Sequence, residues 1–91
     1  MDKAKQVELL KQVLDEIPYL RALYFKNGEF TVWKNKVCQI LDSDYGKESA
    51  EYRRFVNATG KAFLIRTELG QEQEYHRQLD CYEEVLKSLI N

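Results

Sequence analysis

Residues 30–41 read FTVWKNKVCQIL, and this stretch decides the fold class of the chain. Its large apolar side chains recur every three or four residues, with lysines and polar residues between them: Phe30, Trp33, Val37, Ile40 and Leu41. This spacing is typical of an α-helix that turns one face toward a core. Asn27 is a suitable N-terminal cap, and Gly46 favours the left-handed conformation that ends many helices. We therefore predict a helix that begins after Asn27 and ends near residues 44–46.

Three further segments carry helical patterns. Residues 2–17 predict an amphipathic helix that ends near Pro18, because the residue before a proline avoids helical backbone angles. A short helix is expected after Ser49, a good N-terminal cap, with an apolar face made of Tyr52, Phe55 and Val56. A long helix is expected from Gln71 to the end of the sequence. Between these helices, residues 18–28 predict a turn or 3₁₀ segment on the core, and residues 61–70 an extended or partly helical connector.

Together these segments predict an all-α fold, a small up-and-down bundle of four helices with an irregular connector around residues 60–70. Ninety-one residues suffice for one packed core and are too few for two, so we expect a single helical domain spanning residues 1–91. The apolar faces of the four helices predict the core: Leu10, Leu14, Trp33, Val37, Leu41, Phe55, Leu79, Tyr82 and Leu86.

The charge balance and the hydropathy narrow the classes of function. Basic and acidic residues nearly cancel, 14 against 15, which leaves a net charge of -1. Proteins dedicated to nucleic acids or membrane surfaces usually carry a strong basic excess. The first residues lack the apolar run of a secretion signal, and no apolar run approaches the roughly 20 residues that span a bilayer. We therefore expect a cytoplasmic protein with no membrane segment.

The sequence offers no recognisable catalytic or metal-binding pattern. Phosphate-loop, dinucleotide and HExxH motifs are absent, and His76 is the only histidine. His76 and Cys81 are five residues apart, so they point to different faces of one helix, and Cys38 lies in another segment. We interpret both cysteines as free, half-buried thiols, and Trp33 as core rather than as the wall of an aromatic ligand pocket. No enzyme activity, cofactor or metal is expected.

Two groups of residues are candidate interaction surfaces. Arg53, Arg54, Lys61 and Arg66 could form a basic patch beside aromatic residues, which would bind a protein or a nucleic acid, or simply be solvated. The apolar faces of the first and last helices are wider than one core requires, and we expect Leu9, Val85 and Leu89 near the centre of a homodimer interface. The alternative is that residues 62–65 fold back and cover these faces within a monomer.

Several spaced features resemble a small helical domain that occurs, often N-terminally, in uncharacterised bacterial proteins. They read Ile17-Pro18-Tyr19-Leu20, then Phe30, Trp33 and Val37 ahead of Ile40-Leu41, then Tyr45-Gly46, Ser49 and Arg54-Phe55. The resemblance covers about half of the chain and implies an accessory, sensing or assembly role, with no catalytic residues to carry over. We therefore expect a non-enzymatic protein-interaction or oligomerisation module, an accessory domain of a larger bacterial protein. The alternative is a nucleic-acid-associated accessory domain that uses the basic patch.

Overall fold

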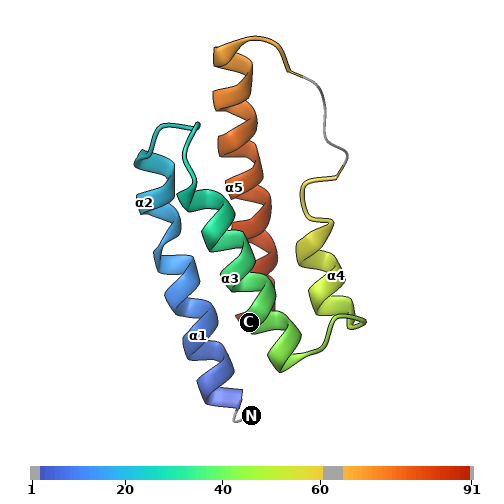
Figure 1. Ribbon diagram of the computed structural model, residues 1–91. Helices are drawn as coiled ribbons and strands as arrows, with labels where there is room; N and C mark the ends of the chain where they lie inside the picture. Colours follow the sequence, from blue (N-terminus) through green and yellow to red (C-terminus); the bar gives the residue numbers. More distant parts are fainter. Residues whose placement is uncertain (1–2, 61–64, 91) are drawn as a thin grey trace.

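A computed structural model describes residues 3–60 and 65–90, and within these residues the regular structure is entirely helical. The helices are α1 (Lys3–Asp15), α2 (Ile17–Ala22), α3 (Glu29–Asp44), α4 (Ala50–Val56) and α5 (Glu68–Ile90). Helices α1 and α2 run in one direction, α3 returns, α4 points back again, and α5 runs downward behind α3 from the top of the view in Figure 1. The predicted all-α, up-and-down bundle of four helices is confirmed, with its first helix broken into α1 and α2 at Glu16.

The segment around Pro18 differs from the prediction. A turn or 3₁₀ segment was expected at residues 18–28, but residues 17–22 form the helix α2, with Pro18 in its first turn. A proline is tolerated there because the first N–H groups of a helix have no partner within the helix. Pro18 has no N–H to donate to the carbonyl four residues earlier, so the hydrogen bonds of α1 do not continue through it. Helix α1 therefore ends at Asp15, and α2 begins at Ile17.

The ends of α3 and α4 follow local signals in the sequence. The Oδ1 atom of Asn27 accepts a hydrogen bond from the backbone N–H of Phe30 at 3.0 Å, and the hydroxyl of Ser49 accepts one from Tyr52 at 3.1 Å. Gly46 has a φ of 93°, a left-handed conformation that lets its N–H reach the last carbonyls of α3. All three predicted signals are confirmed.

The last helix begins earlier than predicted. It starts at Glu68 rather than Gln71, because the side chain of Thr67 caps it by accepting a hydrogen bond from the N–H of Gly70 at 3.1 Å. Of the predicted connector at residues 61–70, residues 68–70 therefore belong to α5, residues 65–67 are non-helical, and residues 61–64 lie outside the described residues.

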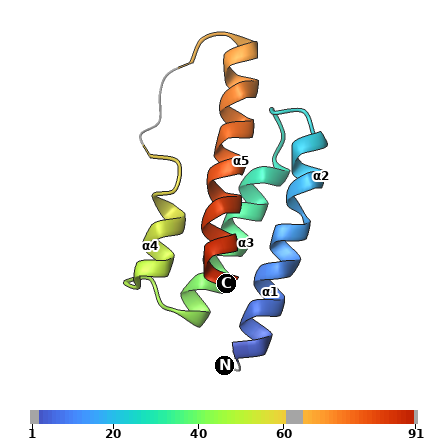
Figure 2. The ribbon, with the colours of Figure 1, turned by 180° about the vertical axis from the view of Figure 1, so that it is seen from behind.

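The core lies where α1 and α4 each pack against both α3 and α5 (Figures 1 and 2). Eight of the nine predicted core residues are buried, and the ninth, Leu14, is half-buried against them. Aromatic rings fill the space between α3 and α5, with neighbouring ring centroids 4.6–6.2 Å apart: Phe30, Trp33, Phe55, Tyr75 and Tyr82. The indole N–H of Trp33 donates to the carbonyl of Val13 at 3.0 Å, which ties α3 to α1.

Helix α4 is the exception to the predicted faces. Phe55 is its buried residue, whereas Val56, expected on the same apolar face, is exposed. A helix of only seven residues presents about two turns, so the small area that meets α3 and α5 is covered by one large side chain and the half-buried Tyr52. None of the described helices combines the length and the apolar character needed to cross a membrane.

Candidate functional site

The described residues form an open cleft between α3 and α5, with a volume of about 360 Å³. Its apolar floor consists of Phe25, Phe30 and Tyr75, with Ile65 at one edge. Its polar rim consists of Lys34, Gln71, Glu74 and Gln78. These eight residues come from four separate parts of the chain, and they define the surface that we call the cleft.

Tyr75 fixes the segment that carries Phe25. The Tyr75 hydroxyl donates a hydrogen bond to the carbonyl of Leu20 at the end of α2, and it accepts one from the side-chain amide of Asn27 at 3.4 Å. The same amide of Asn27 donates to the carbonyl of Tyr24. One buried tyrosine on α5 and one asparagine before α3 therefore hold residues 23–28 in place, and Phe25 packs at the floor of the cleft as a consequence.

Ile65 reaches the edge of the cleft because Gly70 leaves room for it. A β-carbon at residue 70 would lie 2.6 Å from the Cγ2 atom of Ile65 and 2.8 Å from the hydroxyl of Thr67, both far inside van der Waals contact. The amide of Gln71 also donates to the backbone carbonyl of Ile65 at 2.9 Å. The first turn of α5 therefore holds the preceding residues against the cleft.

The two charged side chains at the rim, Glu74 and Lys34, differ in whether they have an oppositely charged partner. Glu74 accepts hydrogen bonds from Arg77 at 2.8 and 2.5 Å and from Gln78 at 3.3 Å, and its side chain is only 17% exposed. The hydrogen bonds from Arg77 are the main reason that the pKa of Glu74 is lowered. The ammonium of Lys34 lies 4.6 Å from the centre of the Phe30 ring, and no described carboxylate forms an ion pair with it. The rim therefore carries a carboxylate that Arg77 already binds and an ammonium that has no ion-pair partner among the described residues.

The end of the bundle that carries the cleft also carries most of the exposed large apolar side chains. Five such side chains are 48–67% exposed: Tyr19, Tyr24, Val32, Val56 and Leu69. All except Val56 lie in α2, in the connection to α3, or in the first turns of α3 and α5, which lie toward the upper end of the molecule in Figure 1. Tyr19 and Val32 also line a second hollow of about 90 Å³ on the other side of α3. We call this end of the bundle the cleft end.

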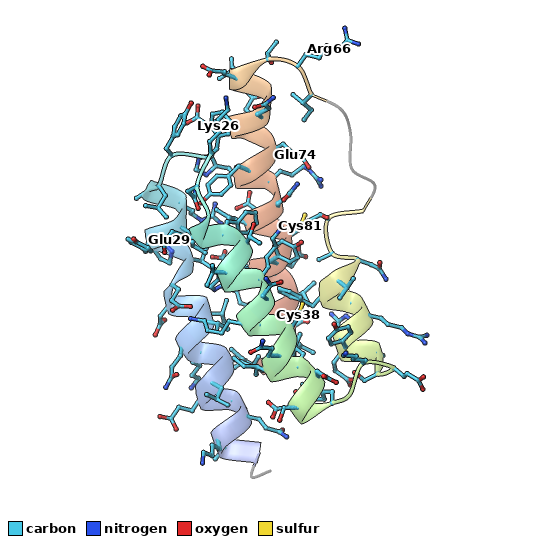
Figure 3. All side chains as sticks on the ribbon, in the orientation of Figure 1. Lys26, Glu29, Cys38, Arg66, Glu74 and Cys81 are labelled. Carbon is cyan, nitrogen blue, oxygen red and sulfur yellow. The ribbon has the colours of Figure 1, made fainter. Side chains whose placement is uncertain are left out.

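The residues of the predicted basic patch do not all come together. Arg53 and Arg54 lie on α4, where Arg54 donates to the hydroxyl of Ser88 on α5 at 2.7 Å. Arg66 lies at the cleft end, far along the molecule from α4 (Figures 1 and 3). Lys61 lies outside the described residues. Binding of nucleic acid by these residues stays a prediction, and the described part of the chain gives it two adjacent arginines rather than a continuous patch.

The predicted dimer interface is less exposed than the sequence indicates. Leu9, Val85 and Leu89 are each half-buried, and the last two pack against the core of the same chain. The proposed fold-back of residues 62–65 falls mainly outside the described residues. A homodimer built on these three residues stays a prediction, but the largest exposed apolar side chains of the described residues lie elsewhere.

The two thiols lie on different helices, Cys38 on α3 and Cys81 on α5, and Figure 3 shows them at different heights in the bundle. Both cysteines are free and half-buried, as predicted. Burial raises the pKa of Cys38, and a hydrogen bond with Tyr52 opposes this effect. Among residues 3–60 and 65–90, no group of three His, Cys, Asp or Glu side chains is arranged to hold a metal ion.

Sequence reasoning missed the cleft as a whole. Phe30 was assigned to the apolar face of a helix. The same side chain also lines the cleft, where Lys34 lies over its ring. The only local signal was the density of apolar residues at 19–25, which is higher than a solvated loop would carry. It predicted packing on the core, and it gave no sign that Gln71, Glu74 and Gln78 would converge beside Phe25.

The residues that carry the resemblance to a small bacterial helical domain fall on described elements. Ile17 and Leu20 are buried on α2, Trp33 and Val37 on α3, and Phe55 on α4. Any helical core of this kind would fill these positions with apolar side chains, so the resemblance stays an expectation. In comparisons with known proteins, no family model, no curated protein and no solved structure matches this chain.

Proposed function

We propose that this chain is a non-enzymatic interaction module that holds a protein partner at its cleft end. The observation that carries the proposal is the cleft between α3 and α5, which combines an aromatic floor with a polar rim. Binding sites are typically concave and largely apolar, with a few polar groups that fix the orientation of the ligand. Such a module would serve as an accessory domain of a larger bacterial protein in the cytoplasm, in line with the resemblance described above.

The surroundings of the cleft support a protein as the partner. Tyr24 and Leu69 are more than half exposed toward the end of the bundle that carries the cleft, and Tyr19 and Val32 are equally exposed on the other side of α3. Tyrosine is enriched at protein interfaces because its ring supplies contact area while its hydroxyl keeps a hydrogen-bond partner. Four such side chains around one end of a small bundle provide an apolar periphery that a small ligand confined to the cleft would leave uncovered.

Site-specific photocrosslinking tests the proposal. A benzoylphenylalanine placed at Tyr24 would report on the cleft end, and the same group placed at Val56 is the matched control, because both side chains are about half exposed. We expect a discrete protein adduct, identified by mass spectrometry, from the first position and none from the second.

The purified partner then provides the quantitative step. Its affinity for the chain with Phe25→Ala should fall by about tenfold or more, and its affinity for the chain with Val56→Ala should not change. Adducts that form equally at both positions, or a partner whose affinity ignores Phe25→Ala, would contradict the proposal. Circular dichroism of each variant checks that the bundle is folded.

A further inference from the structure

The cleft is sized for one large side chain and its neighbour. Its volume of about 360 Å³ is near the lower limit of ligand pockets, roughly 300–1,000 Å³. Its floor of two phenylalanine rings and one tyrosine ring favours an apolar or aromatic group. A folded surface is too flat to reach this floor, whereas one residue of an extended segment can.

The charged residues around the cleft favour a particular chemical group next to the bound apolar side chain. Glu74 already shares its charge with Arg77 through two hydrogen bonds, whereas Lys34 makes a cation–π contact with Phe30 and no ion pair with a carboxylate among the described residues. A second ammonium, Lys26, lies 5.7 Å from the centre of the Phe25 ring, and its carboxylate partner Glu68 is 3.7 Å away and exposed. Lys34 lines the cleft and lies over the Phe30 ring, so a carboxylate on the bound group is complementary to this part of the cleft.

The two rim glutamines offer acceptors to a peptide backbone. The amide nitrogen of Gln71 donates to the carbonyl of Ile65, and that of Gln78 donates to Glu74. In this arrangement, the amide oxygens of both side chains are left to accept hydrogen bonds from a ligand. Backbone N–H groups are the donors that an extended peptide supplies in regular spacing.

We propose that the cleft recognises a short acidic peptide segment of the partner, which places a bulky apolar side chain on the aromatic floor and an adjacent carboxylate on Lys34. This inference rests on the proposed function and names the chemistry of the segment that the cleft holds. The peptide backbone adds hydrogen bonds to Gln71 and Gln78, so a free apolar acid binds more weakly than the peptide.

Three capped tetrapeptides test this chemistry by NMR titration of the ¹⁵N-labelled chain. They are acetyl-Gly-Phe-Glu-Gly-amide, its Phe-Gln analogue without the charge, and its Ala-Glu analogue without the ring. We expect the first peptide to shift the amide signals around the cleft with a millimolar dissociation constant. Removal of the charge should weaken binding about three- to fivefold, the range of an exposed ion pair, and removal of the ring about tenfold.

Variants of Lys34 connect the charge preference to one residue. Lys34→Gln should abolish the difference between the Glu and Gln peptides, and Lys34→Arg should restore it. Lys11→Gln is the matched control, because Lys11 is an exposed lysine on α1 outside the cleft. The NMR spectra also report whether each variant is folded, so loss of binding by unfolding is recognised directly.

The outcomes separate this inference from the proposed function. Equal affinity for the Glu and Gln peptides, or a charge preference that survives in Lys34→Gln, would overturn the acidic specificity and leave the crosslinking result intact. Shifts confined to residues outside the cleft, no shift at all, or equally tight binding of 3-phenylpropionate would overturn the peptide as the occupant. The proposed function fails by a different result, the absence of a crosslink specific to the cleft end.

Discussion

The closed aromatic cluster around Trp33 and the open cleft both lie mainly between α3 and α5, and they share Phe30 and Tyr75. In the cluster, the rings contact each other on all sides, and the single polar atom of Trp33 donates to the carbonyl of Val13. In the cleft, only the ring of Phe25 is half-buried, while Phe30 and Tyr75 are 7% and 5% exposed, and the ammonium of Lys34 has no carboxylate partner among the described residues. Aromatic content alone therefore does not distinguish a core from a binding surface. The two differ in whether the polar atoms beside the rings already have hydrogen-bond or ion-pair partners.

The largest effect is expected in the closed cluster. Trp33 is only 3% exposed, so Trp33→Ala should lower the free energy of unfolding by about 3–5 kcal/mol, the range for truncation of a large buried aromatic residue. Val32→Ala, one residue earlier and exposed, should stay within about 0.5 kcal/mol of the parent chain. Urea melts of both variants measure these values. A loss below about 1 kcal/mol for Trp33→Ala would mean that the cluster is not the stabilising region of the molecule.

Tyr75 joins the two regions, and its hydroxyl is a smaller contribution. Tyr75→Phe keeps the ring in the floor but removes the hydrogen bonds with Leu20 and Asn27, which should cost about 1–2 kcal/mol. Hydrogen exchange should accelerate at residues 23–28 and remain slow in the middle of α3. Tyr19→Phe removes an exposed hydroxyl and serves as the control. Uniform acceleration across the whole chain would show that the connection has no separate stability.

Phe25 is half-buried, so its loss should cost less than that of Trp33. Phe25→Ala should lower the free energy of unfolding by about 1 kcal/mol, because only part of the ring leaves an apolar environment. The neighbouring Tyr24→Ala should have little effect. Thermal and urea unfolding give both values. A cost for Phe25→Ala that equals the cost for Trp33→Ala would assign the cleft floor to the core.

The predicted homodimer interface is a third region and an alternative interaction surface to the cleft end. Sedimentation equilibrium at micromolar concentration decides between a monomer and a homodimer built on Leu9, Val85 and Leu89. If the dimer forms, Leu89→Glu should return it to the mass of one chain, because a carboxylate would be buried at the interface. The parent chain could instead be a monomer whose mass and stability do not change in Leu89→Glu. That result would exclude a homodimer built on these three residues.

The smallest effect concerns the thiol at the margin of the closed region. Burial raises the pKa of Cys38 above its ordinary value of 9.0, so the folded protein keeps this proton at a pH where the unfolded chain begins to lose it. Its contribution to stability is therefore complete below the ordinary value and is lost as the pH rises toward the folded value. In the Cys81→Ser variant, the rate of thiol modification should reach its midpoint at a higher pH in the folded protein than in denaturant. The reverse order would refute the assignment.

The predictions from the sequence that succeeded at α3 and at the helix ends rested on local signals. The spacing from Phe30 to Leu41 gave the helix and its buried face, because side chains three or four residues apart share one side of a helix. Ser49 and Gly46 marked helix ends through bonds that reach only a few residues along the chain. The error at Pro18 had the same origin, because the rule for the preceding residue was weighed without the tolerance for proline in the first turn of a new helix.

The sequence by itself determined that the chain is helical and, for α1, α3 and α5, which side of the helix meets the core, since these follow from periods and caps within one segment. Only the tertiary structure decided that a cleft exists. Its floor depends on a hydrogen bond between Tyr75 and Leu20, which are 55 residues apart, and on the close approach of Ile65 to Gly70. The spacing of apolar residues within one segment cannot predict such contacts. They arise only when separate helices and loops pack together and leave some surfaces covered and others open.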